Sequence, residues 1–290
     1  MDATNSSLYH YTSGDGLIGI LRNKSLWATD INFLNDHREF ELGSKLIGDL
    51  SKVKVQELIK KNFADSLEVR EKLLGDLESF TTSLHSLTSG FNHNTISFTS
   101  KFDCLRHWIS YCNQTTGYCI EFDRKLLSKS LCEIDLPITE FVEIEYAQID
   151  QMNFKIEQEV KEGARIYFER VLHSLSNKTE SEEESHLEFI TKLIQRRIIK
   201  SASLKSQEWE DEAETRFICS TDDAKQLEYR SKNGVIIPYI QCAIDSEAIR
   251  SITIGPASNP ELAHRGLQFL SESAGMDFEI QHSNCSLRDF

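Results

Sequence analysis

Two short clusters of polar side chains could do chemistry, and the first surrounds His10. This histidine stands between Tyr9 and Tyr11, and Thr12 follows at once. An imidazole and a hydroxyl in this setting can hydrogen-bond a sugar hydroxyl, while the backbone of Tyr11 can pair with a carboxamide. A structural histidine near an apolar stretch is the alternative. The cluster therefore predicts a ligand site, but it does not indicate which ligand binds there.

The second cluster is acidic and holds Glu212, Glu214 and Arg216 at alternate positions. In a β-strand these three side chains would share one face. Two carboxylates in one row repel unless a cation lies between or opposite them, and Arg216 or a bound cationic group could be that cation. A carboxylate held against an oxocarbenium ion is the chemistry of glycosidic bond cleavage. A solvated edge strand with an ion pair is the alternative.

Two further groups could contribute to a site. Residues 103–112 predict a short helix capped by Asp103, with Trp108 and Tyr111 on one face. A ring there could stack on a flat heterocycle, although core packing is the usual role of such a pair. Asn35 or its neighbour Asp36 could also face a ligand, although the spacing here equally fits the start of a helix.

Glycines 14, 16 and 19 match the GxGxxG pattern of dinucleotide-binding folds. The preceding strand is polar and aromatic, and no second βαβ unit follows, so the pattern favours a turn with Asp15 as a helix cap.

The elements that must position these residues alternate irregularly along the chain. The mixture predicts an α+β fold with an antiparallel or mixed sheet. Helical patterns cover residues 14–23, 36–86, 151–176, 183–200 and 259–274, and strand patterns cover residues 8–12, 95–99, 117–122, 139–149, 213–219, 234–242, 250–254 and 277–283.

Composition limits the classes of partner. The net charge is −14 over 290 residues, which disfavours non-specific binding to nucleic acid or anionic membrane. No apolar run approaches roughly 20 residues, so we expect no membrane span. Seven cysteines without a CxxC pair and a start unlike a signal peptide favour free thiols in the cytoplasm. A basic cluster is expected at a solvated helix end and is also a candidate phosphate contact: Arg196, Arg197, Lys200 and Lys205.

With these motifs in order, the chain resembles domain-of-unknown-function family 2971, found mostly in bacteria. The resemblance runs from residue 8 to about residue 288. Its motifs are residues 9–12, 16–21, 26–29 and 34–40, then Ser97-Phe98-Thr99, Asp103, Trp108, Tyr111, Gly117, Cys119 and Phe122, then Trp209, Glu212, Glu214 and Arg216, and finally Pro238-Tyr239, residues 252–256, Ser283 and Arg288.

That family is in turn similar, at greater distance, to ADP-ribosyltransferases of the His-Tyr-Glu class. The similarity implies one domain over residues 1–290, with a split, mostly antiparallel sheet, NAD in its cleft and helical insertions at about 43–93 and 150–205. It implies Glu212, Glu214 and His10 as catalytic residues, without choosing between the glutamates. It implies no metal, and NAD contacts by His10, Tyr11, Thr12, Asn35, Ser97, Phe98, Trp108, Tyr111 and Arg216.

The implied activity is transfer of ADP-ribose from NAD to a protein or nucleic acid, as in bacterial toxins and anti-phage effectors. The insertions would then bind the target or an antitoxin. Three alternatives remain: an NAD glycohydrolase, an enzyme like RNA 2′-phosphotransferases, and a non-catalytic module that senses a nucleotide or binds a protein.

Overall fold

The computed structural model describes most of the chain and divides it into two compact units. Described are residues 7–34, 37–89, 92–112, 117–148, 156–157, 160–161, 164–165, 168, 195–196, 198–232, 234–256 and 259–285, the side chains of 37–48 and 79–89 excepted. Unit 1 comprises residues 1–33, 94–144 and 208–290, and unit 2 comprises residues 34–93 and 145–207. Each unit has an apolar core of its own.

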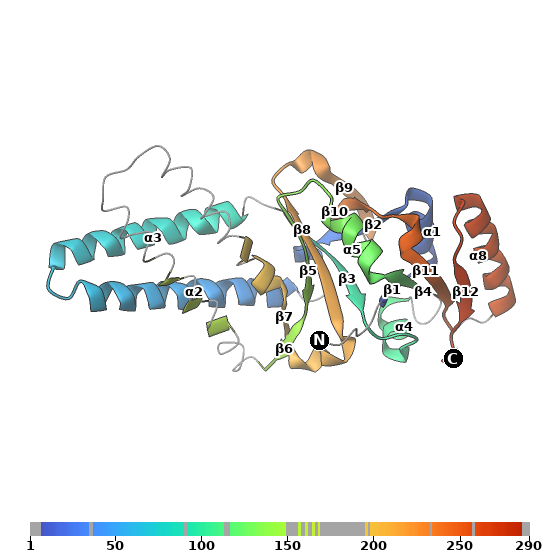
Figure 1. Cartoon of the computed structure of the whole chain (residues 1–290), viewed down its shortest axis with the longest axis horizontal. Helices are drawn as coiled ribbons and strands as arrows, with labels where there is room; N and C mark the ends of the chain where they lie inside the picture. The colour runs from blue at the N-terminus through green and yellow to red at the C-terminus, as the bar shows by residue number, and fades with distance from the viewer. Residues whose placement is uncertain are drawn as a thin grey trace. The chain divides into compact units, whose positions relative to one another are not determined.

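Unit 1 is a mixed α/β structure built on an open, mostly antiparallel sheet (Figure 1). The strand order is β12-β11-β4-β1-β3-β2-β10-β9, and β8 joins β3 to β5. Strands β11 and β12 pair in parallel. The strands are β1 (Ser7–Thr12), β2 (Ser25–Asp30), β3 (Asn92–Thr99), β4 (Tyr118–Asp123), β5 (Ile138–Glu143), β8 (Glu214–Thr221), β9 (Leu227–Lys232), β10 (Val235–Ala243), β11 (Ile249–Ile254) and β12 (Glu279–His282).

Strand β3 is the branch point of this sheet because it pairs with β1, β2 and β8. Its pairing with β1 is limited to one register position, Tyr9 opposite Thr99. Next to that position the two strands diverge, and Ser97 is exposed in the middle of β3. Peptide groups that have left a ladder need other partners. The divergence therefore leaves a natural place for a ligand between β1 and β3.

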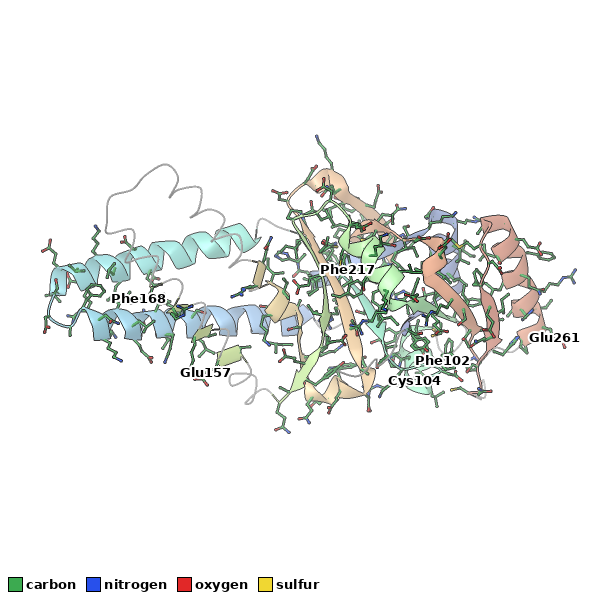
Figure 2. All side chains as sticks on the ribbon, in the orientation of Figure 1. Phe102, Cys104, Glu157, Phe168, Phe217 and Glu261 are labelled. Carbon is green, nitrogen blue, oxygen red and sulfur yellow. The ribbon has the colours of Figure 1, made fainter. Side chains whose placement is uncertain are left out.

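Helices α1 (Gly14–Asn23), α5 (Arg124–Cys132) and α8 (Pro260–Ala274) contribute leucines to the core of unit 1. Strand residues such as Phe98 and Phe217 complete this core, and Phe217 is labelled in Figure 2. The short helix α4 (Leu105–Tyr111) instead packs with β1 in a separate cluster that contains Tyr11 and Trp108. The two faces of β1 thus have different neighbours: one face packs into the core of unit 1, and the other packs against α4.

The glycine-rich segment after β1 is a turn and a helix start. Ser13 caps α1, its Oγ accepting the Gly16 N–H at 3.2 Å. The expectation that Asp15 is the cap is therefore wrong, because Asp15 already lies inside the first turn. Gly16 is needed for space, since a Cβ atom there would lie 2.1 Å from Oγ1 of Thr12.

Unit 2 contains the helices α2 (His37–Asn62) and α3 (Leu67–Ser89), which pack against each other. Its core includes Ile59, Leu73 and Phe168, the last labelled in Figure 2. A short parallel pair, β6 (Glu145–Ala147) and β7 (Leu204–Ser206), belongs to the same unit. The helices expected at 151–176 and 183–200 lie mostly outside the described residues. No helix in the described ranges is long and apolar enough to cross a membrane.

The described residues of the expected basic patch differ in their exposure. Lys205 is buried, with 3% of its surface exposed, and Lys200 pairs with Glu145 at 2.6 Å. Arg196 is exposed, and Arg197 lies outside the described residues. Among the described residues, Arg196 therefore fits the solvated helix end that the sequence suggested, whereas the buried Lys205 of β7 does not.

Candidate functional site

A small pocket of about 90 Å³ lies in unit 1 where β1 and β3 diverge. Helix α4, the 3-10 helix η3 (Gln207–Glu212) and the start of β8 complete its walls. The lining brings together seven of the site residues expected from the sequence, and Tyr9, Thr99 and His107 also line the pocket: the seven are His10, Tyr11, Ser97, Phe98, Tyr111, Glu212 and Glu214. They come from four separate stretches of the chain.

His10 is half-buried in this pocket and is held by the backbone of β3. Its Nδ1 atom lies 3.0 Å from the carbonyl oxygen of Ser97. A carbonyl only accepts, so Nδ1 carries the proton and Nε2 presents a lone pair. Burial lowers the pKa of His10, and the positive charge of Arg230 lowers it further. His10 is therefore neutral near pH 7, with an acceptor nitrogen suited to a ligand hydroxyl.

Glu212 is the carboxylate that Tyr111 orients. The Tyr111 hydroxyl donates to Oε1 of Glu212 at 2.6 Å, and the carboxylate side chain is buried, with the residue 4% exposed. Thr99 Oγ1 donates to the Glu212 backbone carbonyl at 2.7 Å. Glu212 ends η3, and β8 begins only at Glu214, so Glu212 does not belong to the strand that holds Glu214 and Arg216. The hinge between them is Ala213, whose φ of 44° is unfavourable for a residue with a Cβ atom.

Glu214 has a different partner and a different role. Arg216 donates to both of its carboxylate oxygens, from Nε at 2.7 Å and from a terminal nitrogen at 3.0 Å. Both side chains are buried, at 6% and 5% exposed. Such a two-point pair fixes the carboxylate and neutralises its charge. Arg216 is the cation that the acidic row required, and it does not line the pocket.

His107 lines the pocket and was not singled out from the sequence. It is 3% exposed and stacks on Tyr11 with ring centres 4.9 Å apart. The ring hydrogen-bonds the backbone carbonyl of Glu212, whereas Nδ1 has no partner among the described residues, so Nε2 is the donor. Burial lowers the pKa of His107, against the opposing effect of Glu212. A second neutral imidazole therefore supports the segment that carries Glu212.

Several expected contacts lie elsewhere. Trp108 is fully buried, and its Nε1 donates to Asp103 at 2.8 Å. It therefore packs in the core, which was the alternative to stacking on a ligand. Asp103 consequently does not cap α4, whose N-cap is Cys104. Thr12 does not line the pocket. Asn35 lies outside the described residues, so its expected contact stays a prediction.

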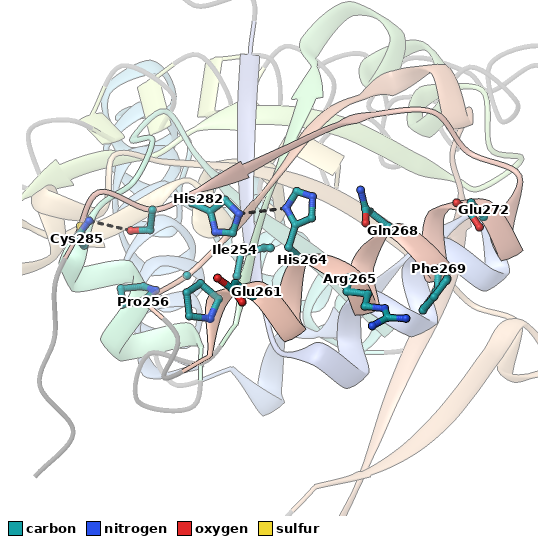
Figure 3. Close-up of a pocket in the computed structure, with 13 residues that line it drawn as sticks. Ile254, Pro256, Glu261, His264, Arg265, Gln268, Phe269, Glu272, His282 and Cys285 are labelled. Atoms are coloured by element: carbon teal, nitrogen blue, oxygen red, sulfur yellow. Dashed lines mark hydrogen bonds between the residues drawn. The ribbon is translucent and has the colours of Figure 1, made fainter.

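A second, more open groove of about 1000 Å³ runs along α8 and β12 (Figure 3). His264 Nδ1 and His282 Nε2 lie 3.1 Å apart within it, with nearly parallel rings. None of the residues that the sequence singled out for chemistry lines this groove. Among the described residues, no three or more His, Cys, Asp or Glu side chains form a metal-binding group. The small pocket is therefore the better candidate despite its size.

The chemical content of the small pocket is one oriented carboxylate, a neutral acceptor imidazole and aromatic walls. A buried carboxylate can stabilise positive charge that develops beside it, because few waters screen the interaction. The imidazole can fix a hydroxyl group. The fixed pair of Glu214 and Arg216 keeps the second carboxylate from competing for that charge.

Comparison with known proteins gives one match. Residues 107–217 match the family described as a protein of unknown function (DUF2971), which is the family that the motifs indicated, over that segment of the chain. The matched segment includes His107, Tyr111, Glu212 and Glu214 of the pocket. No curated protein and no solved structure matches the chain.

Proposed function

We propose that this protein is an ADP-ribosyltransferase, which cleaves the bond between nicotinamide and ribose in NAD and passes ADP-ribose to a macromolecule. The observation that carries the proposal is the convergence of His10, Tyr111 and Glu212 on one pocket, from three separate segments. The branching of the sheet at β3 supports it, because the expected fold has a split sheet with its ligand in the cleft.

In the proposed reaction, Glu212 is the catalytic carboxylate. The glycosidic C–N bond breaks and its electron pair leaves with nicotinamide, which becomes neutral. The ribose carbon is left with oxocarbenium character, which the negative charge of Glu212 stabilises. An acceptor atom then bonds to that carbon and loses its proton. Tyr111 holds Glu212 through the 2.6 Å hydrogen bond.

His10 positions the sugar in this scheme. Its Nε2 lone pair accepts a hydrogen bond from a ribose hydroxyl, while Nδ1 stays bound to Ser97. The neutral state matters, because an imidazolium ion next to a cationic nicotinamide would repel the substrate. Glu214 is a positioning residue, since Arg216 holds it by two hydrogen bonds. Unit 2 is the part of the chain that we propose recognises the acceptor or a regulatory protein.

The test is release of nicotinamide from NAD by the purified full chain, alone and with cell lysate. A drop of about 10²- to 10³-fold is expected for Glu212→Gln, the usual effect of removing one group that stabilises transition-state charge. Glu210→Gln is the matched control, an exposed acid two residues earlier in η3. Dependence on lysate would identify a macromolecular acceptor, whereas equal release without lysate would indicate hydrolysis.

The proposal fails if the wild-type chain releases no nicotinamide in either condition and binds no NAD by calorimetry. That result would favour the non-catalytic alternative.

A further inference from the structure

Arg230 lies in an aromatic cluster on the face of the sheet opposite the core of unit 1. Its guanidinium carbon is 5.5 Å from the ring centre of Trp27 and 6.0 Å from that of Tyr239. It donates to the hydroxyl of Thr29 at 2.8 Å. The register places Thr29 opposite Tyr239 and Arg230 opposite Ile237, so these side chains of β2, β9 and β10 share one face.

The charge of Arg230 has no carboxylate partner within ion-pair distance among the described residues. Its Nε and the nearby Trp27 Nε1 are both buried donors without a hydrogen-bond partner in the part of the chain that the structure describes. Native proteins satisfy nearly all such donors, and each unsatisfied one is destabilising. The side chain is half-buried, and burial lowers the pKa of its guanidinium. Two unsatisfied donors and an unpaired positive charge in one cluster indicate a missing negatively charged acceptor.

This cluster is near the proposed NAD pocket. Arg230 donates to Thr29, and Thr29 lies opposite Thr95 of β3. Ser97, two residues further along β3 and on the same face as Thr95, lines that pocket. The pocket holds about 90 Å³, whereas sites for drug-sized ligands are typically about 300–1,000 Å³. It can therefore enclose only the reacting end of a dinucleotide. The rest of such a ligand must lie along the neighbouring surface.

We propose that Arg230, with Trp27 and Thr29, forms an anion subsite that receives the phosphate groups of a dinucleotide whose reacting end occupies the pocket. This inference rests on the proposed function for the identity of the ligand. The guanidinium supplies charge and paired N–H donors, a geometry that matches phosphate oxygens. The aromatic rings hold the guanidinium in place while leaving its charge unneutralised.

The test compares three probes: NAD, nicotinamide riboside, which lacks phosphate, and inorganic pyrophosphate. The variant is Arg230→Gln, and the matched control is Lys232→Gln, which removes an exposed charge two residues further along β9. We expect Arg230→Gln to raise KM for NAD about 10- to 100-fold, as for loss of a hydrogen-bonded charge. KM for nicotinamide riboside should stay unchanged, and Lys232→Gln should affect neither.

Pyrophosphate binding, measured by calorimetry and by thermal unfolding, tests the subsite without any reaction. Pyrophosphate should raise the unfolding midpoint of the wild type and of Lys232→Gln, but not of Arg230→Gln. If the wild type cleaves no NAD yet binds pyrophosphate through Arg230, the subsite stands and the proposed function fails.

The opposite pattern would overturn the subsite. If NAD is cleaved and Arg230→Gln leaves the ratio of the two KM values unchanged, Arg230 has only a structural role at the sheet edge. If Arg230→Gln lowers the unfolding midpoint but leaves the ratio of the two KM values unchanged, the role of Arg230 is again only structural. Absence of pyrophosphate binding to the wild type, or equal binding to both variants, also refutes the subsite.

Discussion

Replacing the two pocket glutamates by glutamine, one at a time, should separate chemistry from stability. Glu214→Gln removes the negative charge that faces Arg216 at 2.7 and 3.0 Å, where both side chains are at most 6% exposed. Removing one partner of a buried ion pair typically costs about 3–5 kcal/mol. At about 2–4 °C per kcal/mol for a protein of this size class, the unfolding midpoint should fall by roughly 6–20 °C.

Glu212→Gln should behave differently. The glutamine amide oxygen can still accept the Tyr111 hydroxyl, which is now 2.6 Å from Oε1. The free energy of unfolding then falls by about 1 kcal/mol, because one hydrogen bond is no longer assisted by a charge. We therefore expect a small change in the unfolding midpoint together with a large loss of nicotinamide release. Urea unfolding and release kinetics on the same preparations provide both measurements.

A double variant tests the ion-pair argument itself. Replacing a buried pair by apolar side chains of similar size is often neutral or stabilising. Glu214→Leu with Arg216→Met should therefore recover most of the stability lost in Glu214→Gln. The reasoning is refuted if Glu214→Gln is as stable as the wild type, or if Glu212→Gln loses as much stability as Glu214→Gln.

Three further outcomes are expected. Tyr111→Phe should reduce nicotinamide release about tenfold, because Glu212 loses the 2.6 Å hydrogen bond that orients it. Loss of that hydrogen bond should raise the activation free energy by about 1.5 kcal/mol. Unchanged release would contradict the orienting role of Tyr111. Ala213→Gly should raise the free energy of unfolding by up to about 1 kcal/mol, because the φ of 44° is easy only for glycine, and a loss of stability in urea would contradict that. Because burial lowers the pKa values of His10 and His107, the unfolded chain binds more protons below their ordinary value of 6.5, and stability should fall as pH drops through 6.5. His107→Phe should make that fall shallower in pH-dependent urea titrations, and an unchanged slope would contradict it.

The sequence predicted the site best where the signal was local. The residues around His10, Tyr111 and Glu212 were identifiable from short motifs, and the structure places all three in one pocket. Trp108 shows the limit of spacing, because it shares a helical face with Tyr111, yet its Nε1 bonds with Asp103 and keeps the ring in the core.

Residues defined by distant partners could not be found in this way. His107 belongs to the site through its hydrogen bond to the backbone carbonyl of Glu212, far along the chain. Arg230 depends on the register of β9, β10 and β2, which no local pattern specifies. The left-handed conformation of Ala213 has no sequence signature, because glycine is the usual residue there.

The two insertions that build unit 2 have a consequence for how such chains diversify. One connects β2 to β3, and the other connects β5 to β8; in each case the two strands are antiparallel neighbours. Each insertion is therefore an enlarged hairpin connection. The entropic cost of closing a loop grows only logarithmically with its length, so such connections can lengthen, shorten or be exchanged while the ladders around them persist. All residues that line the pocket belong to unit 1. The helical unit can thus change in length or sequence without replacing any residue that lines the pocket.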